Sequence, residues 1–286
     1  MDEIELIRKI ADDPWHDTRA EIVRAVCESL QWIGPDGQPK LSSCGLALRR
    51  MEADGVIWLP LPTRAPAALK TPAFTAASDP QPTIFGSRRD LTDLHLVAVA
   101  SPEHSRLYTE LLSRHHYLGG RPMIGAQIRY LAYDGERVLA AMGFGAAAWK
   151  IAPRDRFIGW TDAERRANLH LIVQLRRLLI LPWVQVKNLA SSLLAMAAHT
   201  LPEQWRQRTA YAPVLLESFT EHDRFQGTSY AAANWIKVGR TKGRGKLDTH
   251  HRGGQSIKDI WLLPLAPDFR ATLTDGRLPS DPARLP

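Results

Sequence analysis

Four residues in the C-terminal two thirds of the sequence have side chains that can transfer protons: Tyr230, Glu217, His116 and Asp155. A phenol, a carboxylate or an imidazole acts as a general acid or base when its surroundings move its pKa toward neutrality. Glu217 follows the apolar run 214–216, which is typical of a buried strand, and Tyr230 lies on the short helical segment after it. We expect this carboxylate and phenol to form an acid–base pair, with a purely structural role as the alternative for each.

His116 and Asp155 are the other two candidates for catalysis. His116 precedes Tyr117 at the end of an expected helix, and an imidazole is the side chain that most readily titrates near neutral pH. Asp155 stands between Arg154 and Arg156. It would either orient a base or a nucleotide group, or form a structural ion pair, which is the commoner role.

A basic, glycine-rich segment supplies the clearest signal for binding. Its cationic side chains are Arg240, Lys242, Arg244 and Lys246, with two glycines among them. Glycine allows close approach of a phosphate to the backbone, while Arg and Lys neutralise its charge. The chain has 286 residues and a formal net charge of +7, which favours a polyanionic partner. The alternative is a solvated loop without a ligand.

Three more residues are candidate contacts to nucleic acid. Lys150 ends an expected strand, and Trp160, which starts the next element, would stack on a base or belong to the core. Asn188 lies near the start of an expected helix, 186–199. A helix N-terminus can receive a phosphate, although Asn there is also a common helix cap.

Composition limits the functional classes. Hydrophobic residues make up 44% of the chain and charged residues 23%, as in globular proteins, and the sequence has no run of about 18 apolar residues. The polar N-terminus does not resemble a secretory signal, and Cys27 and Cys44 have no metal-ligand spacing. We therefore expect a cytoplasmic protein without a metal site.

The spacing of apolar residues predicts two domains. Residues 1–62 read as three helices and a strand at 56–59, which suggests a winged helix-turn-helix domain. Its third helix would carry Arg49 and Arg50 toward DNA, or these side chains would only solvate an exposed face. Prolines concentrate in residues 63–90, which predicts an exposed linker.

The second domain is expected at 91–265, followed by a poorly ordered tail, 266–286. Asp134 and Gly135 mark a hairpin, and Thr161 with Glu164 marks a helix start. The expected strands cover 94–99, 127–133, 137–142 with an extension over 143–151, 178–181, 214–216, 235–238 and 260–265. The expected helices cover 101–114, 186–199 and 228–234, while 154–160 is expected to be a connecting segment.

Several long motifs occur in order along the second domain. They read HHYLGG from residue 115, FGAAAWKIAPRDRFIGW from residue 144, RRLLILPWVQVKNLASSLL from residue 176, and the segment 213–245. Together they resemble the DruA family of the Druantia anti-phage system and its relatives near transposons. Two places depart from the family pattern as we know it, at 174–176 and at Ser229 and Ala231, and these departures would alter an activity that depends on them.

Segment 213–245 also resembles the last strand–helix–strand unit of the GNAT-type N-acyltransferase fold. The resemblance implies an α+β fold with a mixed sheet and places the family's Tyr on Tyr230. It also places the turn that binds the pyrophosphate of acyl-coenzyme A on Gln185, Asn188 and Ala190. Because Asn188 replaces a glycine there, acyl-coenzyme A is not the cofactor we expect.

These observations lead to a hypothesis of a DNA-binding, DNA-acting protein of a defence system or mobile element. Its partner would be single- or double-stranded DNA, and its reaction would modify or process a strand. The alternatives are an acyl-coenzyme A-dependent N-acyltransferase and a non-catalytic DNA-binding module that recruits a helicase or a transposase.

Overall fold

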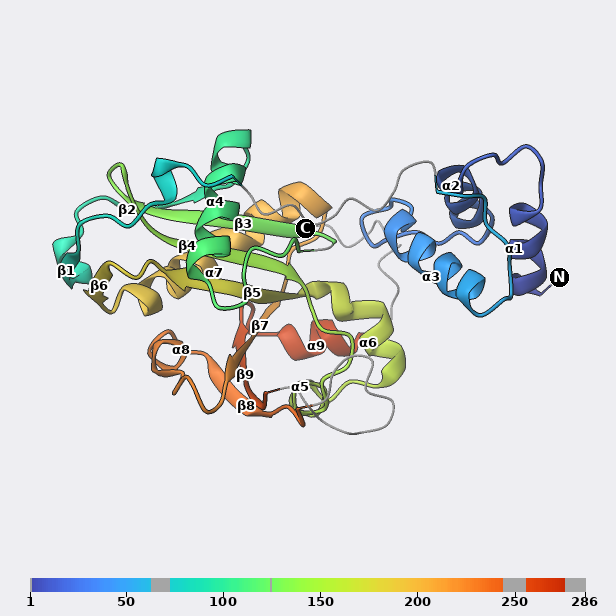
Figure 1. Cartoon of the computed structure of the whole chain (residues 1–286). Helices are drawn as coiled ribbons and strands as arrows, with labels where there is room; N and C mark the ends of the chain where they lie inside the picture. The colour runs from blue at the N-terminus through green and yellow to red at the C-terminus, as the bar shows by residue number, and fades with distance from the viewer. Residues whose placement is uncertain (1, 63–72, 124, 244–255, 276–286) are drawn as a thin grey trace. The chain divides into compact units, whose positions relative to one another are not determined.

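The chain forms two compact units, Met1–Lys70 and Thr71–Pro286. The structure, a computed structural model, describes residues 2–62, 73–123, 125–243 and 256–275 (Figure 1). Arg244 and Lys246, two of the expected phosphate contacts, lie outside the described residues.

The first unit contains three helices, α1 (Glu3–Ala11), α2 (Arg19–Ser29) and α3 (Leu41–Ala53). The capping box at the start of α2 forms as the sequence predicts, with Thr18 and Glu21 satisfying each other's backbone donors. The expected strand at 56–59 is wrong, because this segment pairs with no strand in the described part of the unit. Ile57 and Leu59 pack into the helical core instead. The three helices are therefore confirmed, whereas the winged form of the domain stays a prediction.

The second unit is built on a seven-stranded mixed sheet in the order β2-β3-β4-β5-β7-β9-β8. The strands are β2 (Leu94–Ala98), β3 (Gln127–Asp134), β4 (Arg137–Ala146), β5 (Ile172–Ile180), β7 (Leu215–Glu221), β8 (Ile236–Arg240) and β9 (Lys258–Pro264). Neighbouring strands are antiparallel except β5 and β7, which are parallel. The α+β class with a mixed sheet is thus confirmed.

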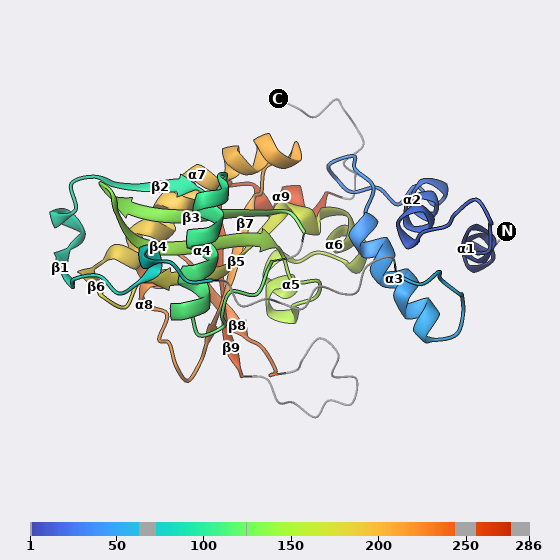
Figure 2. The same ribbon diagram turned by 45° about the horizontal axis from the view of Figure 1, so that its top comes forward.

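Two long helices cover opposite faces of this sheet, α4 (Pro102–His115) and α7 (Leu189–Thr209) (Figure 2). Consecutive residues of β3 show this arrangement, because side chains alternate between the faces of a strand. Arg129 contacts Ser105 of α4, and the Tyr130 hydroxyl donates to Gln204 of α7, 2.7 Å away. A short helix, α8 (Thr228–Ala232), lies beside α7 on the same face.

The expected linker is wrong over residues 73–90, which belong to the second unit. The Glu110 carboxylate on α4 accepts hydrogen bonds from the backbone and hydroxyl of Thr75, both at 2.8 Å. Strand β1 (Ile84–Ser87) pairs in parallel with β6 (Val184–Lys187). Proline content alone did not reveal these contacts, because they depend on partners distant in the sequence.

Three further expectations need correction. The segment expected to connect two elements is a helix, α5 (Ala152–Ile158), which ends at Gly159 in the left-handed region. Helix α7 begins at Leu189 and continues past the expected end to Thr209, although it contains a proline. The expected tail includes α9 (Phe269–Thr274), whose buried Phe269 and Leu273 join the core around α5 and α6 (Asp162–Asn168).

Candidate functional site

A cavity of about 220 Å³ opens where β5 and β7 diverge. The two parallel strands pair from Ile172 and Leu215 as far as Leu175 and Ser218, and they separate beyond that point. The cavity is lined from both faces of the sheet, with His116 and Tyr117 after α4 on one side and Tyr230 of α8 on the other. It therefore passes through the gap between the strands.

A β-bulge directs two consecutive arginines toward this cavity. The register between β4 and β5 shifts at Gly143 and Phe144, which pair with Arg177 and Leu175 and leave Arg176 as the extra residue. A bulge places neighbouring side chains on one face where regular alternation would separate them. Arg176 and Arg177 both line the cavity and donate to backbone oxygens, and in the described chain neither forms an ion pair.

The electrostatic state of these arginines favours an anion nearby. Burial lowers the pKa of the Arg176 guanidinium, the charge of Glu217 opposes this, and Arg177 lowers it further. Two neighbouring positive charges without a paired carboxylate are stabilised by any anion that enters between them. The cavity therefore has the character of an anion site.

Aromatic side chains form the wall next to the arginines. The rings of His116 and Tyr117 stack with centroids 4.8 Å apart, and Tyr117 lies 6.0 Å from Phe225. The Arg224 guanidinium lies over both the Tyr117 and Phe225 rings. Tyr117 and Phe225 are about two-fifths exposed, which leaves aromatic surface for a planar ligand to contact.

The structure changes the role of His116. Burial, with the charges of Arg177 and Arg224, lowers the pKa of His116 to about 4, so its ring is neutral at pH 7. Its Nδ1 accepts a hydrogen bond from the Leu118 backbone N–H at 3.1 Å. The proton of the neutral ring is therefore on Nε2, which donates rather than accepts. His116 lines the cavity and offers Nε2 as a hydrogen-bond donor, and its role in catalysis stays a prediction.

Tyr230 lies at the cavity, but its partner is Ser218 and not Glu217. The Tyr230 and Ser218 hydroxyl oxygens are 2.9 Å apart. Glu217, one position earlier on β7, points to the opposite face because side chains alternate along a strand. The predicted Glu217–Tyr230 pair is therefore wrong by one residue.

Burial raises the pKa of Tyr230 to about 12, against the effect of the Ser218 hydrogen bond. The ring is packed between Trp235, edge-on at 5.3 Å, and Trp261, stacked at 5.6 Å. Gly227, just before α8, allows this packing, because a Cβ at this position would lie 2.1 Å from the Trp261 ring. The result is a fixed phenol that stays protonated at neutral pH and is suited to donate a hydrogen bond, rather than to transfer a proton, to a group in the cavity.

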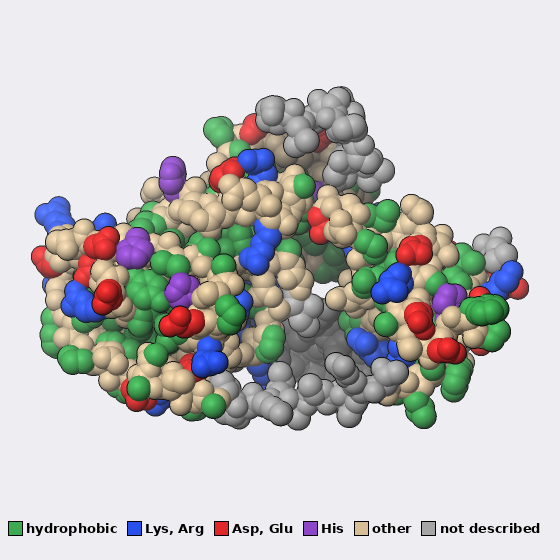
Figure 3. All heavy atoms as spheres, turned by 90° about the horizontal axis from the view of Figure 1, so that it is seen from above, with side chains coloured by type: hydrophobic (Ala, Val, Ile, Leu, Met, Phe, Trp, Pro, Cys, Tyr) green, Lys and Arg blue, Asp and Glu red, His purple; other side chains and the backbone are tan. Residues whose placement is uncertain are grey.

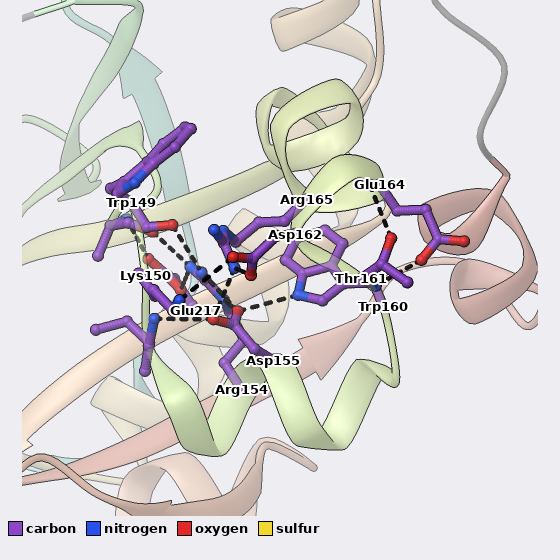
Figure 4. Close-up of polar contacts among 12 residues, drawn as sticks. Trp149, Lys150, Arg154, Asp155, Trp160, Thr161, Asp162, Glu164, Arg165 and Glu217 are labelled. Atoms are coloured by element: carbon purple, nitrogen blue, oxygen red, sulfur yellow. Dashed lines mark hydrogen bonds and ion pairs between the residues drawn. The ribbon is translucent and has the colours of Figure 1, made fainter.

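Glu217 and Asp155 belong to a separate buried network (Figure 4). The Glu217 carboxylate accepts from Arg154 Nη1 at 2.8 Å and from the Ala148 N–H at 2.7 Å. Burial raises the pKa of Glu217, and Arg154 and the Ala148 amide oppose that rise. Asp155 accepts from Arg154 Nη2 at 2.8 Å and from Trp160 Nε1 at 3.1 Å. Neither carboxylate lines the cavity, so both predictions of catalysis lose their basis.

Trp160 and Lys150 lie around the same network. Trp160 is buried, donates to Asp155 and lies beneath the Arg154 guanidinium, so the prediction that it stacks on a base is wrong. Lys150 is exposed and lies 3.5 Å from Asp162 in an ion pair. Its predicted contact with a phosphate stays a prediction.

Residues 185–190, where the resemblance places the turn that binds acyl-coenzyme A, have a different arrangement in this protein. Gln185 is not in a turn, because its backbone lies in β6 and pairs with Phe85 of β1. Asn188 has φ +64°, its side chain caps nothing, and it does not line the cavity. Asn188 takes the left-handed backbone conformation that glycine favours, directly before α7, so the expectation about acyl-coenzyme A stays a prediction.

The remaining expected contacts lie at two other places. Arg240 ends β8, where its Nε donates to the buried Asp259 at 3.2 Å, and the exposed Lys242 follows. Arg49 and Arg50 are exposed near the end of α3 in the first unit. Exposure is compatible with the predicted contacts to nucleic acid and does not test them.

Sequence reasoning missed the residues that define the cavity. Arg176 and Arg177 stand in a segment with no expected strand, and Ser218 was included in a polar loop. One signal was available, since two adjacent arginines among apolar residues are expensive to bury without a ligand or partner. The bulge that places them on one face leaves no mark in the sequence.

Two structural tests concern metals and membranes. Within the described ranges, no three His, Cys, Asp or Glu side chains are grouped as metal ligands. No helix in this part of the chain combines the length and apolarity needed to cross a membrane.

The chain was compared with solved structures and with protein families. The solved structures that resemble the chain include acetyltransferases, and one, from Streptococcus pneumoniae, belongs to the GNAT family (14% identity, 59% of this chain, 99% of that chain, TM-score 0.38). A putative acetyltransferase of Salmonella typhimurium, solved with its cofactor acetyl-CoA, is 12% identical over 62% of this chain and 96% of its own (TM-score 0.40). The Escherichia coli ribosomal-protein-S18-alanine N-acetyltransferase is 10% identical over 60% and 94% (TM-score 0.37). Similarity at this level carries no information about activity.

The family is more specific than the fold. The profile of Druantia protein DruA matches residues 67–256, about two thirds of the sequence. The chain therefore belongs to the DruA family, as its motifs predict. No curated protein matches it.

Proposed function

We propose that this protein binds a nucleic-acid strand and acts on it as part of an anti-phage defence system, with one nucleotide held in the cavity between β5 and β7. The observation that carries the proposal is the bulge in β5. It brings Arg176 and Arg177 to a cavity that also contains the Tyr230 phenol and an aromatic wall. Guanidinium groups recognise phosphate, and aromatic rings stack on bases. Membership in the DruA family supports the defence role.

The chemistry available in the cavity is hydrogen bonding to developing charge. Tyr230 supplies a protonated phenol beside Ser218, and His116 supplies a second donor through Nε2. These groups suit the stabilisation of an oxyanion or the polarisation of a base carbonyl, with the arginines neutralising a phosphate. Identification of the products decides whether the reaction modifies the strand or cleaves it.

The distribution of surface charge agrees with a localised site. On the face that Figure 3 shows, basic and acidic side chains are interspersed, so the net positive charge is not gathered there. On that face, basic side chains do not form a broad cationic surface.

Short single- and double-stranded DNAs incubated with the protein and analysed by mass spectrometry test the proposal. We expect modified nucleosides or altered strands with the wild-type protein and their loss with Arg177→Ala. Arg206→Ala is the matched control, because this exposed arginine on α7 pairs only with Glu203 of its own helix and lies outside the cavity. Unaltered DNA together with unchanged binding in Arg177→Ala would refute the proposal. A rise in melting temperature with acetyl-coenzyme A would favour the acyltransferase alternative instead.

A further inference from the structure

A cluster of cations lies along the sheet from the cavity. Asp259 of β9 is only 2% exposed and bonds to two cationic side chains of β8 and to the imidazole of His222, which follows β7. Its Oδ2 is 2.7 Å from Lys237 Nζ and 3.1 Å from His222 Nδ1, and its Oδ1 is 3.2 Å from Arg240 Nε. We call these four residues the Asp259 cluster. One carboxylate faces two permanent positive charges, so the cluster keeps a net positive charge.

The cluster and the Tyr230 side of the cavity share one face of the sheet. Alternate residues of β7, and His222 directly after its end, point to this face, and each contacts a different partner. Ser218 meets Tyr230 at the cavity, Thr220 accepts from Trp261 Nε1 at 3.0 Å, and His222 reaches Asp259. Asp259 pairs with Thr220, which itself lines the cavity, so at about 3.3 Å per residue the cluster lies two residues, roughly 7 Å, along β7 from Ser218.

A bulge also positions the cations of the cluster. The register between β8 and β9 shifts between Lys237 and Gly239, so Lys237 pairs with Trp261 and Arg240 with Asp259. Both cations therefore share the face of Trp261 and Asp259. Lys237 and Arg240 remain 38% and 53% exposed while bonded to the buried carboxylate, so their charges reach solvent in fixed positions.

We propose that the Asp259 cluster binds a backbone phosphate of a single nucleic-acid strand whose neighbouring nucleotide occupies the cavity. This inference rests on the proposed function and defines its substrate class. A cavity of about 220 Å³ is below the usual size of a drug-sized ligand pocket and takes one unstacked base, not a base pair. Trp261 lies between the cavity and the Asp259 cluster. It is only 5% exposed, so its ring is not available for a second base to stack on. The stretch between them therefore suits a sugar–phosphate backbone.

Binding measured as a function of strand length tests the subsite. Fluorescence anisotropy competition would compare a mononucleotide, short single strands of DNA and of RNA, and a blunt duplex. We expect the affinity of the wild-type protein to rise between the mononucleotide and a strand of a few nucleotides, and to be weak for the duplex. The DNA and RNA strands show which sugar the site accepts.

Variants of the cluster separate the subsite from the cavity. Arg240→Ala is expected to weaken the binding of short strands about fivefold, the upper range for loss of an exposed ion pair. The affinity for the mononucleotide should stay unchanged. The slope of log affinity against log salt should fall by about 0.7, the value for one phosphate on a single strand. Arg206→Ala is the matched control, since Arg206 is also 53% exposed and paired with one carboxylate.

Asp259→Asn distinguishes a positioned subsite from general attraction. This change makes the protein one unit more positive, so attraction by net charge alone would tighten binding. The proposal expects weaker binding of short strands, because Lys237 and Arg240 lose the carboxylate that fixes them. Equal effects of Arg240→Ala and Arg206→Ala, or an affinity independent of strand length, would overturn the subsite. Failure of the wild-type protein to bind any strand or nucleotide would instead overturn the proposed function.

Discussion

Two groups of charged residues in the second unit differ in how their charges are balanced. Around Arg154, the Glu217 and Asp155 carboxylates accept hydrogen bonds from the guanidinium in the interior. At the cavity, Arg176 and Arg177 face open volume and bond only to backbone oxygens among the described residues. A buried charge with all its partners stabilises a fold, whereas a charge held without a counterion is available to a ligand. We therefore assign a structural role to the residues around Arg154 and a ligand-binding role to Arg176 and Arg177.

Removing one member of the buried network gives the largest expected change. Glu217→Gln leaves the Arg154 guanidinium buried with less compensation, which costs about 3–5 kcal/mol of unfolding free energy. The melting temperature should fall by roughly 10 °C or more, as measured by calorimetry. If Glu217→Gln melted at the same temperature as the wild-type protein, the network around Arg154 would not have the structural role assigned to it.

His116 gives the cavity a pH signature. Because its pKa is lowered to about 4 in the folded protein, protonation favours the unfolded chain, whose histidines titrate near 6.5. The resulting stability is complete above about pH 6.5 and is lost as the pH falls toward 4, by roughly 3 kcal/mol in total. Denaturant unfolding of wild type and His116→Gln from pH 7 to pH 4 measures the difference. Parallel pH profiles for the two proteins would show that His116 is not held neutral.

The cavity could be predicted only in part, because local sequence signals do not specify how distant segments pair. Local signals were sufficient for the Thr161–Glu164 helix start and the hairpin at Asp134, because capping and turn chemistry involve residues close in sequence. Glu217 was assigned to the site because the expected strand ended at residue 216, but β7 continues to Glu221 and alternation turns Ser218 toward Tyr230.

The bulge in β5 lies beyond sequence reasoning for a physical reason. It depends on how β5 pairs with β4, and this register is set by packing across the whole sheet. The same limit applies to α9, whose apolar residues become interpretable only when the surfaces of α5 and α6 are known. The sequence showed which side chains could take part in chemistry. It did not show which of them lie together in one cavity.

Tyr230→Phe tests whether the cavity is catalytic or only binds. The change removes the phenolic hydrogen-bond donor and keeps the ring between Trp235 and Trp261. We expect product formation on the strand to fall at least about 100-fold, the usual lower range for the loss of one donor to developing charge. Strand affinity should stay within a factor of about two. Because Ser218 loses one hydrogen bond, stability should fall by only about 1 kcal/mol.

Ser218→Ala serves as the control for that hydrogen bond. It removes the same bond but retains the phenol, so it should lose a similar amount of stability and keep most of the activity. Equal loss of product in Ser218→Ala and Tyr230→Phe would mean that the pair acts by positioning, and unaltered product in Tyr230→Phe would exclude the phenol as hydrogen-bond donor to the reacting group.

Lys150→Ala gives the smallest expected effect and tests the comparison at the edge of the buried network. Lys150 and Asp162 are 59% and 60% exposed, so solvent screens their interaction at 3.5 Å. We expect less than about 1 kcal/mol of change in unfolding free energy and no change in strand affinity. Denaturant unfolding measures the first quantity and fluorescence anisotropy of a labelled strand the second. If Lys150→Ala weakened strand binding as much as Arg177→Ala, the phosphate contacts would extend to the surface beside the Arg154 network, and the cavity would no longer be a sufficient account of binding.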